Sequence, residues 1–230
     1  MGVDAWVINL PDRTDRWRLQ RTQARLHRVP VRRFVASDAS EGLRSHPASP
    51  LSGGELGLLV SIDRLLRLAS AESGWFAVIE DDALWRPGLK HRLQTLANAL
   101  PESAWVLQAG YLGESSLRPD RTPAQNVRKV LRPRSRVQAW RRGHHANSSG
   151  LFTDRLRAGA QVLLMNPSWA ESMSRHITYS LPWDKEIQRW SVEYPGSVLT
   201  ANRTVAWQLP LRSDIRGRPS GRVLTHPRRP

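Results

Sequence analysis

Three consecutive carboxylates, Glu80, Asp81 and Asp82, follow directly after an apolar run at residues 75–79. Like charges at such short separations repel each other, and burial raises the cost. A folded chain tolerates the cluster where water solvates it or a cation neutralises it. Mg²⁺ and Mn²⁺ prefer carboxylate oxygens and also bind diphosphates. The pattern therefore favours a metal–diphosphate site, and the alternative is a solvated loop whose acidic residues cap a helix beginning near Pro87.

The elements that would position these carboxylates follow from the spacing of apolar residues. Apolar runs predict strands at residues 5–10, 31–36, 75–79, 105–109 and 161–165, and shorter ones at 198 and 205–207. Helical spacing predicts helices that begin near residues 12, 52, 87, 168 and 182, the first with Trp17, Gln20, Ala24 and Leu26 near one face. Strands that alternate with helices favour an α/β domain with a mostly parallel central sheet. In such sheets ligands bind beyond the carboxyl ends of the strands, where the acidic triplet lies.

The helix predicted from residue 52 has a local start signal. Ser52 and Glu55 have the spacing of a capping box, and apolar residues recur on one face up to residue 69. The N-terminus of a helix also favours an anion, so Glu55 has either a capping role or a contact with a donor substrate, or both. A polar loop is expected over residues 37–50.

The chain reads as one domain over residues 1–212. Residues 110–158 are rich in Arg, Pro, Ser and Gln and predict an irregular Arg-rich insertion or loop. Residues 213–230 are rich in Arg, Pro, Gly and Ser and predict a basic tail.

The net charge of the chain is compatible with several classes of binding partner and does not distinguish among them. The 35 Lys and Arg residues against 20 Asp and Glu give a formal charge of +15, which suits nucleic acid, an anionic membrane surface or a phosphorylated small molecule. The chain has no cysteine, which excludes disulfides, thiolate zinc sites and cysteine nucleophiles. Its start has no secretory pattern, and no apolar run is long enough to span a bilayer. We expect a cytoplasmic protein, with peripheral contact to a membrane or a large assembly left open.

Several blocks of the sequence, taken in order, resemble family 25 glycosyltransferases, the lipooligosaccharide galactosyltransferases and their collagen galactosyltransferase relatives. The blocks span roughly residues 4 to 210. They are Val7-Ile8-Asn9-Leu10 with Arg13, Asp15 and Arg16; Leu51-Ser52 with Gly54-Glu55-Leu56-Gly57; Ala77-Val78-Ile79-Glu80-Asp81-Asp82-Ala83; residues 105–110; Gly159-Ala160-Gln161-Val162-Leu163; and Pro182 with Asp184. The ordered set is more specific than any single block.

The resemblance implies an A-type glycosyltransferase fold, a Rossmann-like α/β sandwich, and transfer of a hexose (galactose or glucose) from a UDP-sugar to a hydroxyl of a glycan, lipooligosaccharide or protein acceptor. It implies Mn²⁺ or Mg²⁺ bound by Asp82 with Glu80. Glu80 and Asp81 would hold the donor or support the metal. A metal with arginine would neutralise the charge that develops on the leaving diphosphate.

Further donor contacts are implied at the end of the first strand, by Asn9, Leu10, Arg13 and Arg16, and beyond the second strand, by Asp38. A solvated helix face is the alternative for the two arginines, and a plain loop turn for Asp38. Inversion, which the resemblance implies, needs a carboxylate that takes the acceptor proton, and Asp184 is the candidate base, with Glu80 as the other catalytic carboxylate. The alternative for Asp184 is an N-cap.

One departure from the family pattern concerns Ile62, which stands where family members have a histidine after Ser61. This departure leaves a catalytically degenerate transferase, kept as a binding module, as an alternative. A basic nucleic-acid-binding protein is another alternative, although no helix-turn-helix, zinc-finger or RNA-recognition pattern is present.

Overall fold

The computed structural model describes residues 3–112, 151–153 and 156–209 of the chain. The strands are β1 (Asp4–Asn9), β2 (Val31–Val35), β3 (Phe76–Glu80), β4 (Ala83–Trp85), β5 (Val106–Leu112), β6 (Phe152–Thr153), β7 (Ala158–Met165), β8 (Val198–Ala201) and β9 (Ala206–Gln208). The helices are α1 (Thr14–His27), α2 (Ala39–Ser45), α3 (Gly53–Ala69), α4 (Leu89–Ala99), the 3₁₀ turn η1 (Pro167–Trp169), α7 (Ala170–Arg175) and α8 (Trp183–Glu193).

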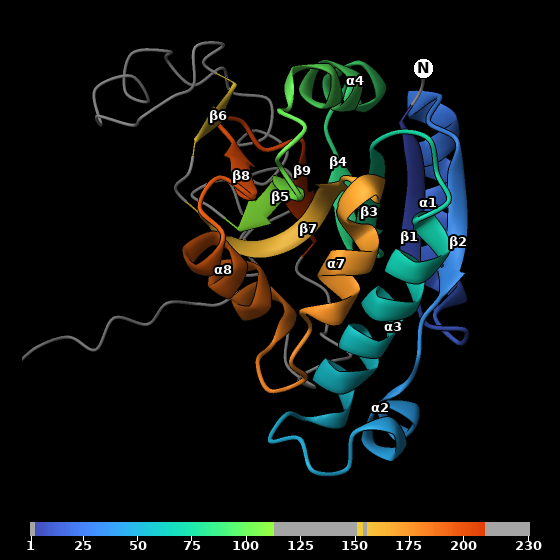
Figure 1. Ribbon diagram of the computed structural model, residues 1–230. Helices are drawn as coiled ribbons and strands as arrows, with labels where there is room; N and C mark the ends of the chain where they lie inside the picture. The colour runs from blue at the N-terminus through green and yellow to red at the C-terminus, as the bar shows by residue number, and fades with distance from the viewer. Residues whose placement is uncertain (1–2, 113–150, 154–155, 210–230) are drawn as a thin grey trace, which may run out of the picture.

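A seven-stranded sheet in the order β2-β1-β3-β7-β5-β8-β6 forms the centre of the molecule (Figure 1). Strand β1 is parallel to β2 and β3, and β5 is parallel to β8. Strand β7 is antiparallel to both β3 and β5, and β6 is antiparallel to β8. Five of the seven strands, β2, β1, β3, β5 and β8, therefore point the same way. The predicted α/β class with a mostly parallel central sheet is confirmed.

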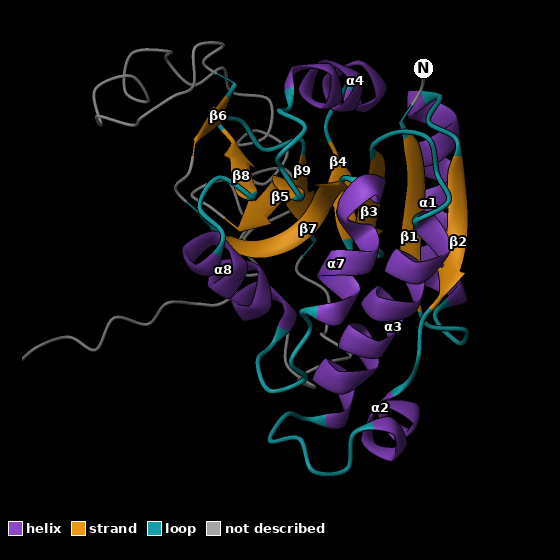
Figure 2. Cartoon of the chain, in the orientation of Figure 1, coloured by secondary structure: helices purple, strands orange, loops and turns teal. Residues whose placement is uncertain are grey.

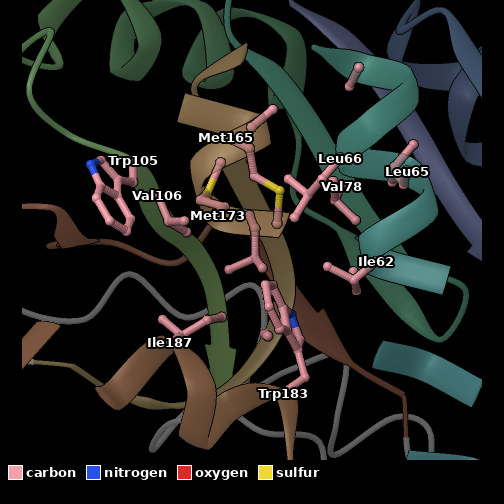
Figure 3. Close-up of a cluster of buried hydrophobic side chains, with 14 of the residues drawn as sticks. Ile62, Leu65, Leu66, Val78, Trp105, Val106, Met165, Met173, Trp183 and Ile187 are labelled. Carbon is pink, nitrogen blue, oxygen red and sulfur yellow. The ribbon is translucent and has the colours of Figure 1, made fainter. Parts of the chain in front are cut away.

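Helices cover both faces of the sheet (Figure 2). On one face, α3, α7 and α8 pack against side chains of the central strands, and Figure 3 shows part of this cluster, including Ile62, Val78, Met165 and Trp183. On the other face, α1 and α4 pack against the alternate residues of the same strands, such as Ala77 and Ile79 of β3. This alternation arises because successive strand residues point to opposite faces.

Helix α3 begins with the predicted capping box, which is confirmed: the Ser52 hydroxyl accepts from the Glu55 backbone N–H, and the Glu55 carboxylate accepts from the Ser52 N–H. One turn later, Gly57 lets α3 approach the segment that joins β2 to α2. A Cβ at this position would lie 2.7 Å from the Ser37 carbonyl oxygen, which is closer than real Cβ atoms come. The glycine therefore fixes how α3 meets the carboxyl end of β2.

The predicted strands and helices are present, with four local corrections. The segment 37–50 is not a plain loop, because it contains α2, which Asp38 caps by accepting from the Glu41 N–H. A short strand, β4, follows the acidic triplet. Strand β5 continues to Leu112, into the segment expected to be irregular. Strand β6 also lies in that segment. Leu26, which the helical spacing grouped with Trp17, Gln20 and Ala24, is 75% exposed.

Most of the Arg-rich insertion predicted over residues 110–158, and all of the tail predicted over residues 213–230, lie outside the described residues. In the part of the chain that is described, no helix is both long enough and apolar enough to span a bilayer.

Candidate functional site

The acidic triplet lies at the carboxyl end of β3, beside the carboxyl end of β1. Glu80 is the last residue of β3 and is in register with Ile8 of β1. The chain then turns at Asp81 and Asp82 and enters β4, which pairs with β9. The strand order thus brings residues from both ends of the chain to one edge of the sheet.

A cavity of 350 Å³ opens at this edge. Its walls come from the ends of β1 and β3, the start of α2, the first turn of α3, helix α1 and strand β9. The residues that line it are Ile8, Leu10, Arg16, Ala36, Ser37, Asp38, Ala39, Gly54, Leu58, Glu80, Asp81, Asp82 and Gln208. One side is acidic, and the rest is formed mainly by apolar side chains and small residues. The cavity therefore combines apolar walls with a few converging polar groups, as ligand sites commonly do.

Asp81 is held in place by residues of β1 and α1. Asn9 Nδ2 donates to Asp81 Oδ2 at 2.7 Å, and Arg16 Nη1 donates to Asp81 Oδ1 at 2.8 Å. Asn9 and the Arg16 side chain are almost fully buried, at 1% and 6% exposure. Arg33 Nε in turn donates to Asn9 Oδ1 at 2.9 Å. Both carboxylate oxygens of Asp81 are therefore engaged, which gives this residue a positioning role in the structure.

Two side chains on the inner face of α1 form hydrogen bonds with the backbone of the turn at Asp81 and of the strand that follows. Gln20 Nε2 donates to the carbonyl oxygens of Asp81 and Ala83, at 2.8 and 2.9 Å. Gln23 Nε2 donates to the Ala83 carbonyl at 3.0 Å, and Gln23 Oε1 accepts from the Trp85 N–H at 2.7 Å. The sequence analysis did not predict this function for the two glutamines. The signal that could have found it is a pair of amides among the inward-facing positions of the helix.

Asp82 is oriented from the opposite side by β9. Gln208 Nε2 donates to Asp82 Oδ2 at 3.0 Å, and the Leu209 N–H donates to the Asp82 carbonyl at 2.9 Å. Asp82 is 6% exposed and lines the cavity. The sequence analysis also missed Gln208, which is distant from the acidic triplet in sequence.

Electrostatics set Glu80 apart from the two aspartates. Burial raises the pKa of Glu80 to about 8, and repulsion from Asp82 and then Asp81 adds to this effect. A hydrogen bond with Gln161 opposes the shift in the Glu80 pKa, and repulsion from Asp184 supports it. Strong perturbation of a carboxyl in a cavity is typical of functional sites.

Asp184 lies in the first turn of α8, where its charge acts on Glu80. It is exposed and makes no hydrogen bond with any described residue. The alternative that Asp184 caps this helix is wrong, because Pro182 occupies the N-cap position. The carboxylate of Asp184 is therefore accessible to solvent, and Asp184 is not among the residues that line the cavity.

The remaining candidates divide into residues on the cavity and residues beside it. Leu10 and Asp38 line the cavity. Asp38 also caps α2, and hydrogen bonds from Ser40 and from the Glu41 N–H lower its pKa. Arg13 is not among the lining residues; it pairs with Asp15 at 3.1 Å at the start of α1. Glu55 acts in the capping box one residue after Gly54 of the cavity wall.

Ile62 of α3 is 2% exposed and packs in the hydrophobic core (Figure 3). It is not among the residues that line the cavity, although Leu58, one turn earlier on α3, is. Its neighbour Ser61 links α3 to the end of β2, because Ser61 Oγ accepts from the Ser37 N–H at 2.8 Å. The departure from the family pattern at Ile62 therefore falls on the hydrophobic core.

Two carboxylates of the cavity could act as ligands of a divalent metal ion. Within the described part of the chain, no group of three or more His, Asp or Glu side chains is arranged to hold a metal ion. Mg²⁺, however, is commonly bound by one or two carboxylates together with substrate phosphates and water. Glu80 and Asp82 supply two carboxylates on the cavity wall, so the chemistry of these ligands fits a metal that arrives with a diphosphate.

Similarity to known proteins is found at the level of solved structures, and it is distant. No protein-family model matches the chain, and no curated protein matches it. Among solved structures, the chain is similar to the crystal structure of mouse xyloside xylosyltransferase 1 in its apo form, with 12% sequence identity and a TM-score of 0.38; the match covers 85% of this chain and 70% of that chain. The resemblance to family 25 stays a prediction, and the function has to be argued from the site.

Proposed function

We propose that the protein is a metal-dependent glycosyltransferase that moves a hexose, galactose or glucose, from a UDP-sugar to a hydroxyl of a glycan or protein acceptor. The observation that carries the proposal is the cavity at the carboxyl ends of β1 and β3, with Glu80, Asp81 and Asp82 together on its wall. Its place in the sheet is where α/β proteins bind nucleotides.

The three carboxylates have different surroundings, and the proposal gives them different roles. Asp81 is bound by Asn9 and Arg16 and positions the turn. Glu80 and Asp82 would hold Mn²⁺ or Mg²⁺, which when bound neutralises charge on the donor diphosphate. Gln208 orients Asp82, and Gln161 bonds to Glu80.

Other parts of the cavity suit the rest of the donor. Leu10, Ala36 and Leu58 offer apolar surface for a flat nucleobase, and Asp38 is an acceptor at the rim. The first turn of α3, at Gly54, presents the N-terminal end of a helix to the cavity, which favours an anion. These features support a nucleoside diphosphate as the ligand.

Asp184 is the proposed general base. It is exposed, it lies near enough to Glu80 to repel it, and it makes no hydrogen bond with a described residue. A carboxylate in that position can accept the proton of an acceptor hydroxyl while the sugar transfers. An inverting reaction follows if the base and the diphosphate lie on opposite faces of the sugar.

The first test is thermal melting of the protein with UDP, GDP and CMP, each with and without Mn²⁺. Ligands that bind only the folded state raise the melting temperature by mass action. The expected result is a rise that requires both UDP and Mn²⁺ and disappears in Asp82→Ala.

The matched control is Glu102→Gln, which removes a carboxylate from an exposed position before β5, far from the acidic triplet in the sheet. This variant should respond to UDP and Mn²⁺ as the wild type does. A melting temperature that no nucleotide raises, or a rise that persists in Asp82→Ala, would contradict the proposed function.

A further inference from the structure

An unusual run of positive charge surrounds helix α1. Residues 16–37 contain seven arginines and no aspartate or glutamate. Surface helices are often stabilised by acidic residues one turn away from basic ones, and this helix has no such partners after Asp15. The structure shows what each arginine does instead.

Three of the seven arginines have partners inside the fold. Arg16 binds Asp81 in the candidate site. Arg32 pairs with Asp4 and Glu72, and Arg33 donates to Asn9 and to the backbone of residues 10 and 11. These contacts account for three of the seven positive charges.

The other four, Arg18, Arg21, Arg25 and Arg28, form what we call the outer arginine stripe. All four are exposed, and none makes a side-chain hydrogen bond or ion pair with any residue that the structure describes. Three of them recur at intervals of three and four residues on α1, so they share one side of the helix. Arg16, Gln20, Gln23 and Ala24 occupy the buried side. The stripe therefore faces solvent, on the side of α1 opposite its buried residues.

The composition of this outer face indicates what it can recognise. Its charged groups are guanidiniums, which bind phosphate oxygens bidentately. The hydroxyl of the exposed Thr22 donates to the Arg18 carbonyl of the same helix. The amides of Gln20 and Gln23, which could read nucleic-acid bases, are buried against the turn after β3. Leu26 projects beside the stripe with 75% of its surface exposed. The face thus offers charge for phosphates and one aliphatic side chain, without groups for reading a sequence.

We propose that the outer face of α1 docks on an anionic phospholipid surface, with the outer arginine stripe on the phosphates and Leu26 at the boundary of the acyl chains. A helix with basic residues and an exposed leucine on one side suits a membrane interface. The inference does not depend on the donor cavity or on any reaction. It does place the candidate site near the surface, because Arg16 on the inner side of the same helix lines the cavity.

The test is co-sedimentation of the full chain with vesicles of phosphatidylcholine alone and with vesicles that also contain phosphatidylglycerol. The wild type should bind only the anionic vesicles. The triple variant R18Q/R21Q/R25Q should weaken that binding about a hundredfold, since each basic residue near an anionic surface contributes about a fivefold gain. The matched control R44Q/R67Q/R175Q removes the same charge from exposed positions on α2, α3 and α7 and should bind as the wild type does.

A second variant separates a lipid surface from other polyanions. Leu26→Gln should weaken vesicle binding about fivefold and leave binding to duplex DNA unchanged, because only a membrane gives the leucine an apolar environment. Equal losses in the two triple variants, or no binding of the wild type to anionic vesicles, would overturn the proposal. So would binding to DNA and vesicles that depends equally on the stripe with no effect of Leu26→Gln. Circular dichroism melting of each variant establishes that it is folded.

Discussion

Two regions of the molecule bury carboxylates, and they neutralise them to very different degrees. Glu186 of α8 is fully buried, and four groups donate to it: Arg189 through Nε and Nη2, at 3.1 and 2.9 Å, the Thr178 N–H at 2.9 Å, and the Thr178 hydroxyl. The acidic triplet places three carboxylates together, and Arg16 forms an ion pair with one of them, Asp81. Glu186 is satisfied by its own donors, whereas we propose that the triplet is completed by a bound cation.

We propose that this difference separates carboxylates that stabilise the fold from carboxylates that bind a ligand. When a buried carboxylate has a full set of donors, removing the carboxylate destabilises the fold, because its charged partner is left buried without compensation. A cluster with an excess of negative charge costs stability in the free protein and becomes favourable when a metal binds. Substitutions and pH changes in the two regions should therefore affect stability differently.

Glu186→Ala should destabilise the fold by about 3–5 kcal/mol, because it leaves the half-buried Arg189 without its principal partner and frees the segment at Thr178. Urea denaturation measures the free energy of unfolding. The control is Glu193→Ala, which removes the more exposed partner of the same arginine and should cost less than about 1 kcal/mol. Equal losses of unfolding free energy in the two variants would contradict the claim that burial of Glu186 makes it a principal stabilising residue.

The free protein should lose stability as the pH rises from about 4.5 to about 8. The pKa of Glu80 is raised to about 8 in the folded state from an ordinary value of 4.5, so between these values the folded state holds a proton that the unfolded state has released. The stability that protonated Glu80 contributes is fully present below its ordinary pKa of 4.5 and is lost above pH 8. We expect a loss of about 2 kcal/mol after allowing for partial solvation. Urea denaturation across this range, with EDTA present, measures it, and a flat profile would contradict it.

Glu80→Gln should remove that pH dependence and stabilise the metal-free protein at pH 8 by about 1–2 kcal/mol, because it deletes one charge from the repelling cluster. The same variant should lose its stabilisation by UDP with Mn²⁺. Thermal melting in both conditions gives the two readings. A variant that is less stable than the wild type at pH 8 would show that the Glu80 charge is already compensated in the free protein.

The smallest effect is expected at Ser52. Its capping-box partner, Glu55, is a third kind of carboxylate, which is bound at the start of a helix. Glu55 is half-buried, and its carboxylate accepts from the Ser52 N–H and hydroxyl in the capping box. Ser52→Ala should cost about 1 kcal/mol, and Ser52→Asp, which keeps a capping oxygen, should cost less. Urea denaturation of the two variants measures the difference. A loss as large as that of Glu186→Ala would show that the cap does more than close the helix.

The sequence predicted the parts of the site that depend on local pattern. The apolar run before Glu80 predicted β3, and the place of the triplet at a strand end followed from it. The capping box at Ser52 and Glu55 was equally local. Gln208 could not be predicted, because its contact with Asp82 depends on the pairing of β4 with β9, which joins segments far apart in the chain.

The errors on α1 have a common cause. The helical spacing grouped Leu26 with Gln20 and did not distinguish which of the two side chains is buried. In the structure the inner face is polar where it meets the turn after β3, and the leucine is outside. A helix that binds backbone carbonyls with amides breaks the usual rule that the apolar side is the buried side. The missed helix α2, in contrast, had a readable signal in Asp38 and Glu41.

The role of the acidic triplet is tested by measuring the rate at which UDP is released from UDP-galactose and from UDP-glucose. The wild type, Asp82→Asn and Asp184→Asn are each assayed with Mn²⁺ and with EDTA. We expect Mn²⁺-dependent release by the wild type, a rate about a thousandfold lower in Asp82→Asn, and a clearly lower rate in Asp184→Asn, with folding retained in both variants. No release by the wild type, or release that Asp82→Asn leaves unchanged, would contradict the claim that the acidic triplet is the reaction centre.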